Sequence, residues 1–114
     1  MEGQELIFLS PRAVLDGSKA IRGGVPICWP AFGPWSQGSQ HGFARSSVWE
    51  VSSVCEERKS LTLSLAQSPA WDQNFLLSLT VTLGETSLDL ELSAKNCNTE
   101  QSFDFTTALH TYFR

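Results

Sequence analysis

The chain has 114 residues, of which 41% are hydrophobic and 18% charged, a composition typical of one globular domain or part of one. Its net charge of -4 disfavours nucleic acid as a partner, because phosphate backbones are bound through clustered cationic surfaces. The longest apolar runs are far below the ~20 residues of a membrane helix, which disfavours a membrane partner.

The first third of the chain predicts a short strand at residues 5–10, followed by a long ordered loop at residues 16–46. The glycines and prolines of this loop exclude a long helix. A disordered linker would hardly contain four large aromatic side chains, which here are Trp29, Phe32, Trp35 and Phe43. We therefore expect an ordered loop, where binding residues concentrate.

Residues 47–114 predict successive antiparallel strands. Leucine and valine alternate with polar residues at 60–65, 77–83 and 88–95, the period of a half-buried strand. Turns are expected at Gly84-Glu85 and Asn96–Asn98, and a longer connection at Ser68–Asp72. The predicted class is all-β, most simply an antiparallel β-sandwich.

The segment 103–112 predicts a final strand in which Phe103, Phe105, Thr107 and Leu109 share one face. The other face carries His110 and Tyr112 beside small residues, which suits a ligand surface. The chain ends at Arg114 without a turn signal, so we expect the complete domain to continue beyond this point.

Two arginines stand in glycine-rich contexts. Arg22 lies in Lys19-Ala20-Ile21-Arg22-Gly23-Gly24, and Arg45 ends Gln40-His41-Gly42-Phe43-Ala44-Arg45. The planar guanidinium matches phosphate oxygens, and glycine lets the backbone approach a ligand closely. Taken alone, these motifs fit two surface arginines with turn glycines better than a phosphate site, because a lone Arg-Gly-Gly is a weak signal.

The two histidines leave similar alternatives open. His41 could contact a ligand or hold its loop, and His110 could be a structural residue of a strand face. An imidazole titrates near neutrality, so His110 is a credible general acid. Trp29 and Trp35 are expected in the core, with stacking on a sugar ring as a second possibility.

Three segments together resemble the glucose-6-phosphate 1-epimerase family, the hexose-6-phosphate mutarotases of the aldose 1-epimerase superfamily. They are Lys19–Pro30, Gln40–Arg45 and Thr107–Arg114, in the family's order, and the resemblance extends from Glu5 to Arg114. It implies a galactose-mutarotase-like β-sandwich. Residues 1–114 would form the N-terminal to central part of this single domain, incomplete at both ends.

The resemblance also implies the chemistry. The family interconverts the α and β anomers of a hexose 6-phosphate by acid–base ring opening, which requires no metal or cofactor. Arg22 and Arg45 would bind the phosphate with Gln40 nearby, His41 would line the sugar site, and His110 would be the general acid. The family's base is a glutamate on a segment that this chain does not contain.

Two other functions remain open: a non-catalytic sugar-phosphate-binding module and an inactive truncated product. The widely spaced Cys28, Cys55 and Cys97 match no zinc-binding pattern, and reduced thiols fit a cytoplasmic protein.

Overall fold

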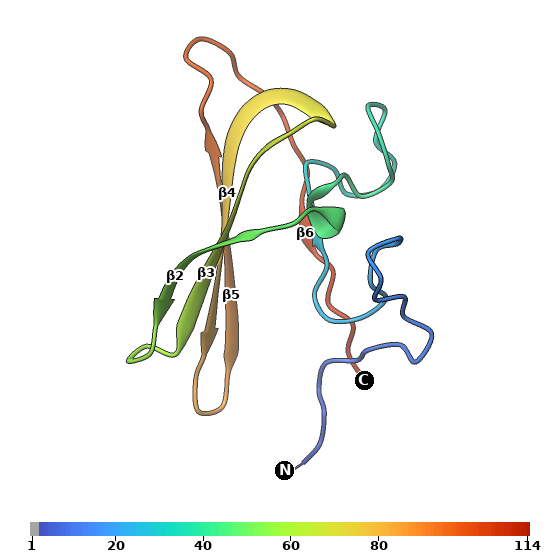
Figure 1. Ribbon diagram of the computed structural model, residues 1–114, viewed down its shortest axis with the longest axis vertical. Helices are drawn as coiled ribbons and strands as arrows, with labels where there is room; N and C mark the ends of the chain where they lie inside the picture. The colour runs from blue at the N-terminus through green and yellow to red at the C-terminus, as the bar shows by residue number, and fades with distance from the viewer. Residues whose placement is uncertain (1–2) are drawn as a thin grey trace. The chain divides into compact units, whose positions relative to one another are not determined.

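A computed structural model describes residues 3–114 (Figure 1). The chain divides into two compact units, one formed by the described residues up to Ser47 with Phe105–Arg114, the other by Val48–Asp104. The described residues form six strands and a single turn of 3-10 helix, η1 (Ala44–Ser46), which confirms the predicted all-β class. None of these residues belongs to a helix long and apolar enough to span a membrane.

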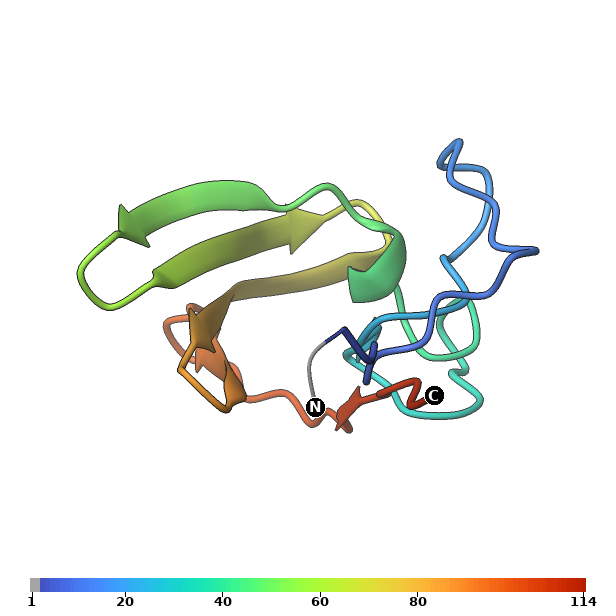
Figure 2. The same cartoon turned by 90° about the horizontal axis from the view of Figure 1, so that it is seen from below.

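The second unit is one antiparallel sheet with the strand order β2-β3-β4-β5 (Figures 1 and 2). Its strands are β2 (Glu50–Cys55), β3 (Ser60–Ser68), β4 (Trp71–Leu83) and β5 (Leu88–Asn96). The three alternating segments expected from the sequence are therefore strands, and each pairs with its neighbour along the chain.

The register of this sheet explains the alternation. Leu65 of β3 lies opposite Leu77 of β4, and Leu77 lies opposite Ala94 of β5. Because successive side chains of a strand point to opposite faces, matched leucines gather on one face. Leu65 and Leu77 are buried, as are Phe75 and Leu79 of β4, so this face is the core of the unit.

The expected long connection at Ser68–Asp72 is wrong. Ser68 pairs directly with Trp71, so Pro69 and Ala70 alone form the turn between β3 and β4. Trp71 is buried, with its ring 4.9 Å from that of Phe103. Burial of this large aromatic side chain stabilises strand pairing up to the turn itself. The expected turns after β4 and β5 are confirmed.

In the first unit, distant parts of the sequence lie side by side. The strands β1 (Ile27–Cys28) and β6 (Ala108–Leu109) pair antiparallel. The predicted strand at residues 5–10 makes only two isolated bridges, from Ile7 to Phe113 and from Leu9 to Gly23.

The predicted final strand is regular only over β6. The residues around it still run antiparallel to the β1 segment, since the Thr106 amide donates to Pro30 O at 2.9 Å and the His110 amide to Pro26 O at 3.0 Å. A proline has no amide hydrogen to return such a bond, so the ladder loses half of its hydrogen bonds at both positions. The two prolines explain why the alternation at 103–112 did not produce a long strand.

Trp29 is the centre of the first unit's core. Its side chain is fully buried, 5.7 Å from the ring of Phe43 and 5.9 Å from that of Phe105. Stacking of Trp29 on a sugar is therefore excluded. Its carbonyl accepts the Phe43 amide at 3.0 Å, and Gly42 packs so closely that a Cβ there would overlap this carbonyl. The aromatic core thus fixes the segment that carries Gln40, His41 and Arg45.

Candidate functional site

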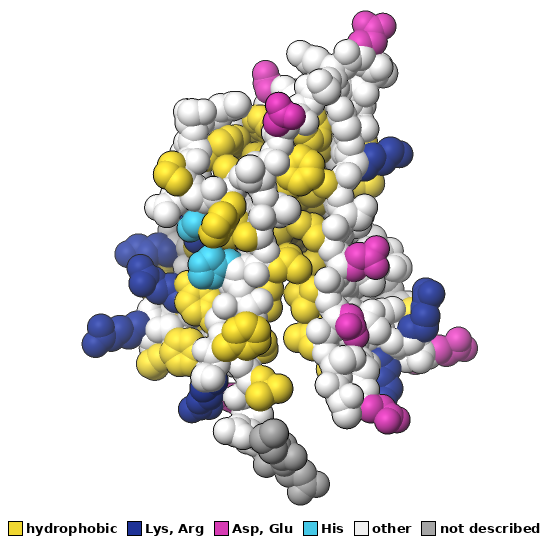
Figure 3. Space-filling model, turned by 180° about the vertical axis from the view of Figure 1, so that it is seen from behind, with side chains coloured by type: hydrophobic (Ala, Val, Ile, Leu, Met, Phe, Trp, Pro, Cys, Tyr) yellow, Lys and Arg dark blue, Asp and Glu magenta, His cyan; other side chains and the backbone are white. Residues whose placement is uncertain are grey.

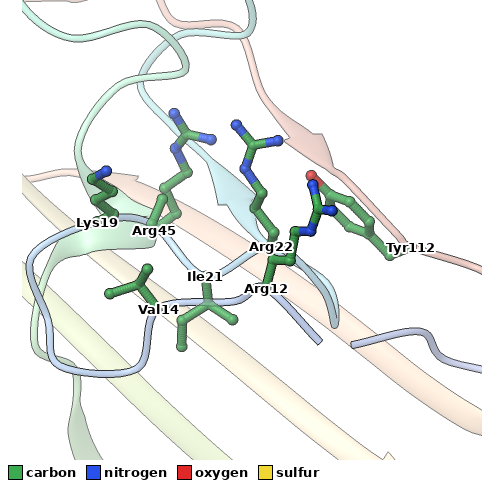
Figure 4. A pocket seen from close by; sticks show the side chains of 8 residues that line it. Arg12, Val14, Lys19, Ile21, Arg22, Arg45 and Tyr112 are labelled. Carbon is green, nitrogen blue, oxygen red and sulfur yellow. The ribbon is translucent and has the colours of Figure 1, made fainter. Parts of the chain in front are cut away.

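The first unit contains a cavity of about 380 Å³ walled mainly by cationic and polar side chains (Figure 4). The lining residues are Arg12, Val14, Lys19, Ala20, Ile21, Arg22, Arg45 and Tyr112. Both arginines predicted from the motifs are among them, although 23 positions separate them in the sequence. Their guanidinium groups lie on the same side of the cavity in Figure 4.

Arg22 is positioned through its backbone. The Ser10 amide donates to Arg22 O, and the Gly24 amide donates to Phe8 O, each at 2.9 Å. Gly23 adopts a φ of +150°, and a Cβ at this position would lie 2.7 Å from the Leu9 Cα. The glycine therefore permits the close approach of two backbone segments that holds Arg22 at the cavity.

Arg45 is positioned by its own side chain. It lies in η1, and its Nη2 donates a hydrogen bond to Gln40 O at 3.0 Å. Its Nε is buried and has no hydrogen-bond partner within the described part of the chain. The guanidinium is thus oriented by the bond from Nη2, while the buried Nε donor stays unsatisfied.

Gln40 itself does not line the cavity. Its side-chain Nε2 lies 3.5 Å from His41 Nε2, so its side chain is next to His41, and its backbone carbonyl accepts the hydrogen bond from Arg45. Gln40 therefore contacts Arg45 through its backbone carbonyl, and its side chain is not part of the cavity wall.

The two histidines lie side by side, as the cyan side chains in Figure 3 show. The ring centroids of His41 and His110 are 5.9 Å apart, and Phe32 stacks on His41 at 5.3 Å. The ring of His110 lies 5.2 Å from that of Tyr112, which lines the cationic cavity. Tyr112 therefore connects the histidine pair to the two arginines within one unit.

The hydrogen bond at His41 defines its protonation. The Gly33 amide donates to Nδ1 at 2.9 Å, so this nitrogen carries no hydrogen and the neutral ring has its proton on Nε2. Burial lowers the pKa of His41, and the charges of Arg45 and His110 lower the pKa further. The hydrogen bond and the lowered pKa both favour a neutral His41 that can donate through Nε2.

Two cationic residues of the cavity, Arg12 and Lys19, are additions to the site expected from the sequence, whereas Tyr112 was expected beside His110 on a face that suits a ligand. Lys19 is three residues before Arg22 in the same motif, so the sequence itself indicates that it lies near the cavity. Arg12 reaches the cavity because Ser10 pairs with Arg22, a nonlocal contact without a sequence pattern of its own.

No metal centre was found among residues 3–114, since no three His, Cys, Asp or Glu side chains of this range are grouped suitably. Cys28, Cys55 and Cys97 are free thiols, and burial raises the pKa of Cys28.

The comparison with known proteins agrees with the resemblance seen in the motifs. A family model described as "Aldose 1-epimerase" matches residues 2–114. A protein of Cenchrus ciliaris is 38% identical over 97% of this chain, and one of Escherichia coli K12 is 39% identical over 96%. Both are named "Putative glucose-6-phosphate 1-epimerase".

A solved structure shows the same fold. The crystal structure of a "putative mutarotase (YeaD)" from Salmonella typhimurium matches 98% of this chain with a TM-score of 0.84 and 37% sequence identity. The predicted galactose-mutarotase-like fold is thereby confirmed. The match covers 39% of that chain, and this chain spans 38% of the length of each of the two curated relatives. Through the family match over residues 2–114, the chain belongs to the aldose 1-epimerase family.

Proposed function

We propose that the first unit carries the phosphate-binding part and the acid of a hexose-6-phosphate mutarotase, acting on glucose 6-phosphate. The observation that carries this proposal is the connection through Tyr112, which lines the cavity of Arg22 and Arg45 and lies 5.2 Å from His110. A phosphate site and a proton carrier thus lie close enough for one small sugar phosphate. Residues 1–114 would accordingly be part of a single mutarotase-like domain.

In this proposal Arg22 and Arg45 bind the phosphate. Arginine forms charge-assisted, bidentate hydrogen bonds to phosphate oxygens, and these bonds are stronger than neutral ones. The sugar ring would then extend past Tyr112 to the histidines. Gln40 and His41 would contact its hydroxyl groups, with the Nε2 hydrogen of His41 as a donor.

His110 would be the general acid. Ring opening requires a proton at the ring oxygen and the removal of another from the C1 hydroxyl, and an imidazole can supply the first near neutral pH. His110 is exposed, so a substrate can reach it. The family resemblance assigns the second transfer to a glutamate of the longer family members.

A non-catalytic sugar-phosphate-binding module is the second candidate, and one observation favours it. The described acidic residues of the first unit are engaged elsewhere: Glu5 pairs with Arg114 at 2.8 Å, and Asp16 accepts the Ser18 amide at 2.9 Å. In this unit the structure gives His110 no carboxylate partner among the described residues. The module would then recognise the ligand without converting it.

We also propose a cytoplasmic location. The three cysteines are free thiols, Cys97 at an exposed position, and free thiols persist in a reducing compartment.

Exchange NMR of the glucose 6-phosphate anomers separates the two functions. The assay is run on this chain and on a chimaera in which residues 3–114 replace the matching region of the Escherichia coli relative. If the protein is a mutarotase, the chimaera should accelerate anomer exchange. Its His110→Gln variant should lose about 10²–10⁴-fold of this acceleration. Unaccelerated exchange in a folded chimaera that binds glucose 6-phosphate would favour the binding module. Exchange at the parental rate after His110→Gln would eliminate His110 as the acid.

A further inference from the structure

On the basis of the proposed function, we propose that Arg12 and Lys19 determine the ligand charge that the cavity selects. With Arg22 and Arg45 binding the phosphate directly, this second cationic pair would favour a doubly charged phosphate monoester over a singly charged ester of the same shape.

The segment that carries Arg12 and Lys19 is held by local hydrogen bonds. At one end, Ser10 Oγ accepts the Arg12 amide at 3.2 Å, and Ser10 O accepts the Ala13 amide at 2.9 Å. At the other end, Asp16 Oδ1 accepts the Ser18 amide at 2.9 Å, immediately before Lys19. These turns place both cations on the cavity wall, although their side chains are exposed.

The four cationic side chains of the cavity have no acidic neighbour in its wall. Over residues 3–114, the ion pair that the structure shows is Arg114 with Glu5, so no carboxylate within 4.0 Å neutralises any of the four. Like charges around one cavity repel one another, and a bound anion relieves this repulsion in proportion to its own charge.

The positions of the four groups favour division into two pairs. In the view of Figure 4, Arg22 and Arg45 are drawn between Lys19 on one side and Arg12 on the other, and all four side chains line the cavity. Arg12 and Lys19 therefore flank the central arginines. From there they add positive potential and polar donors beyond the two charges of the central arginines.

Glucose 6-phosphate and glucose 6-sulfate test this inference directly. Both carry a tetrahedral group, but at about pH 8 the phosphate is a dianion, because its second pKa is about 6, whereas the sulfate ester is a monoanion. Calorimetric titration of the parent chain at low salt should show tighter binding of the phosphate. Arg12→Gln and Lys19→Gln should each reduce this preference about 3–10-fold, mainly by weakening the phosphate complex.

Two further variants serve as controls: one keeps the charge at position 12, and the other removes a positive charge away from the cavity. Arg12→Lys should retain most of the preference, and Arg58→Gln, an exposed arginine between β2 and β3, should leave the preference unchanged. An unchanged phosphate preference in both Arg12→Gln and Lys19→Gln would overturn the inference. An equal loss of affinity for glucose 6-phosphate and glucose 6-sulfate in these two variants would overturn it as well. If instead the parent chain bound glucose 6-phosphate no better than glucose, the proposed function itself would fail.

Discussion

The two central arginines of the cavity are held differently, Arg22 through its backbone and Arg45 through a hydrogen bond from Nη2 to Gln40 O. Replacement of either by alanine should weaken glucose 6-phosphate binding by roughly 1.5–3 kcal/mol, the contribution of a hydrogen bond to a charged group. Calorimetric titration checks this, with unphosphorylated glucose as the reference ligand. Equal losses for both sugars would show that the arginines only support the fold.

His41 provides a test at the same scale. Because Gly33 donates to Nδ1 and burial lowers the pKa, we expect the neutral form of His41, with its proton on Nε2, to predominate at pH 6.5, the usual pKa of histidine. Nitrogen-15 shifts of the imidazole ring report both the charge and the tautomer. A doubly protonated His41 at this pH would contradict the geometry.

The lowered pKa of His41 also determines the sign of a stability effect. Between pH 6.5 and the lower pKa of the folded state, the unfolded chain binds a proton that the folded chain does not. The free energy of unfolding should therefore decrease as the pH falls through this window. In the His41→Gln variant, the melting temperature should fall less than in the parent chain as the pH is lowered. The same pH dependence in both proteins would contradict the lowered pKa of His41.

Among the elements, the segment Gln40–Arg45 depends on one glycine. Gly42 has a φ of +70°, and a Cβ there would overlap the Trp29 carbonyl. Gly42→Ala should therefore destabilise the protein by more than about 1 kcal/mol. Gly17→Ala is the matched control, since Gly17 has a φ of +82° with no atom within 4 Å of its Cβ position.

Urea unfolding measures both variants. Gly17→Ala measures the loss of unfolding free energy that comes from the left-handed conformation alone. Gly42→Ala should lose more, because its Cβ would also overlap the Trp29 carbonyl. Equal losses would mean that contact with Trp29 does not constrain the segment.

The sequence predicted elements well where their pairing was local. The strands β3, β4 and β5 follow one another with short turns, so alternation alone identified them. The strand expected at 103–112 was interrupted because its partner segment contains Pro26 and Pro30, which are remote in the sequence. The same distinction applies to the site: motifs indicated Arg22 and Arg45, whereas Arg12 reaches the cavity only through nonlocal pairing of Ser10 with Arg22.

At the scale of the whole molecule, both units expose large apolar side chains. Leu6 and Phe113 of the first unit are 70% and 76% exposed, and Val51 and Val54 on the edge strand β2 are 63% and 67% exposed. An exposed apolar edge strand favours pairing with another chain. We expect the 114-residue chain to self-associate with increasing concentration.

Sedimentation velocity tests this expectation. Val51→Lys and Val54→Lys should reduce self-association, because a charge on an edge strand opposes edge-to-edge pairing. Thr86→Lys, in the turn between β4 and β5, adds the same charge away from this edge and should have a smaller effect. A monomer at all concentrations would contradict the prediction.

We propose that one unit of the chain binds a hexose 6-phosphate between its cationic cavity and its histidine pair. The most direct measurement is a titration of the nitrogen-15-labelled chain with glucose 6-phosphate, followed through backbone amide shifts. If this proposal is correct, the shifts concentrate at Arg22, Arg45 and His110, remain small along β2–β5, and are much weaker with glucose. Shifts confined to β2–β5, or identical shifts with glucose and glucose 6-phosphate, would contradict it.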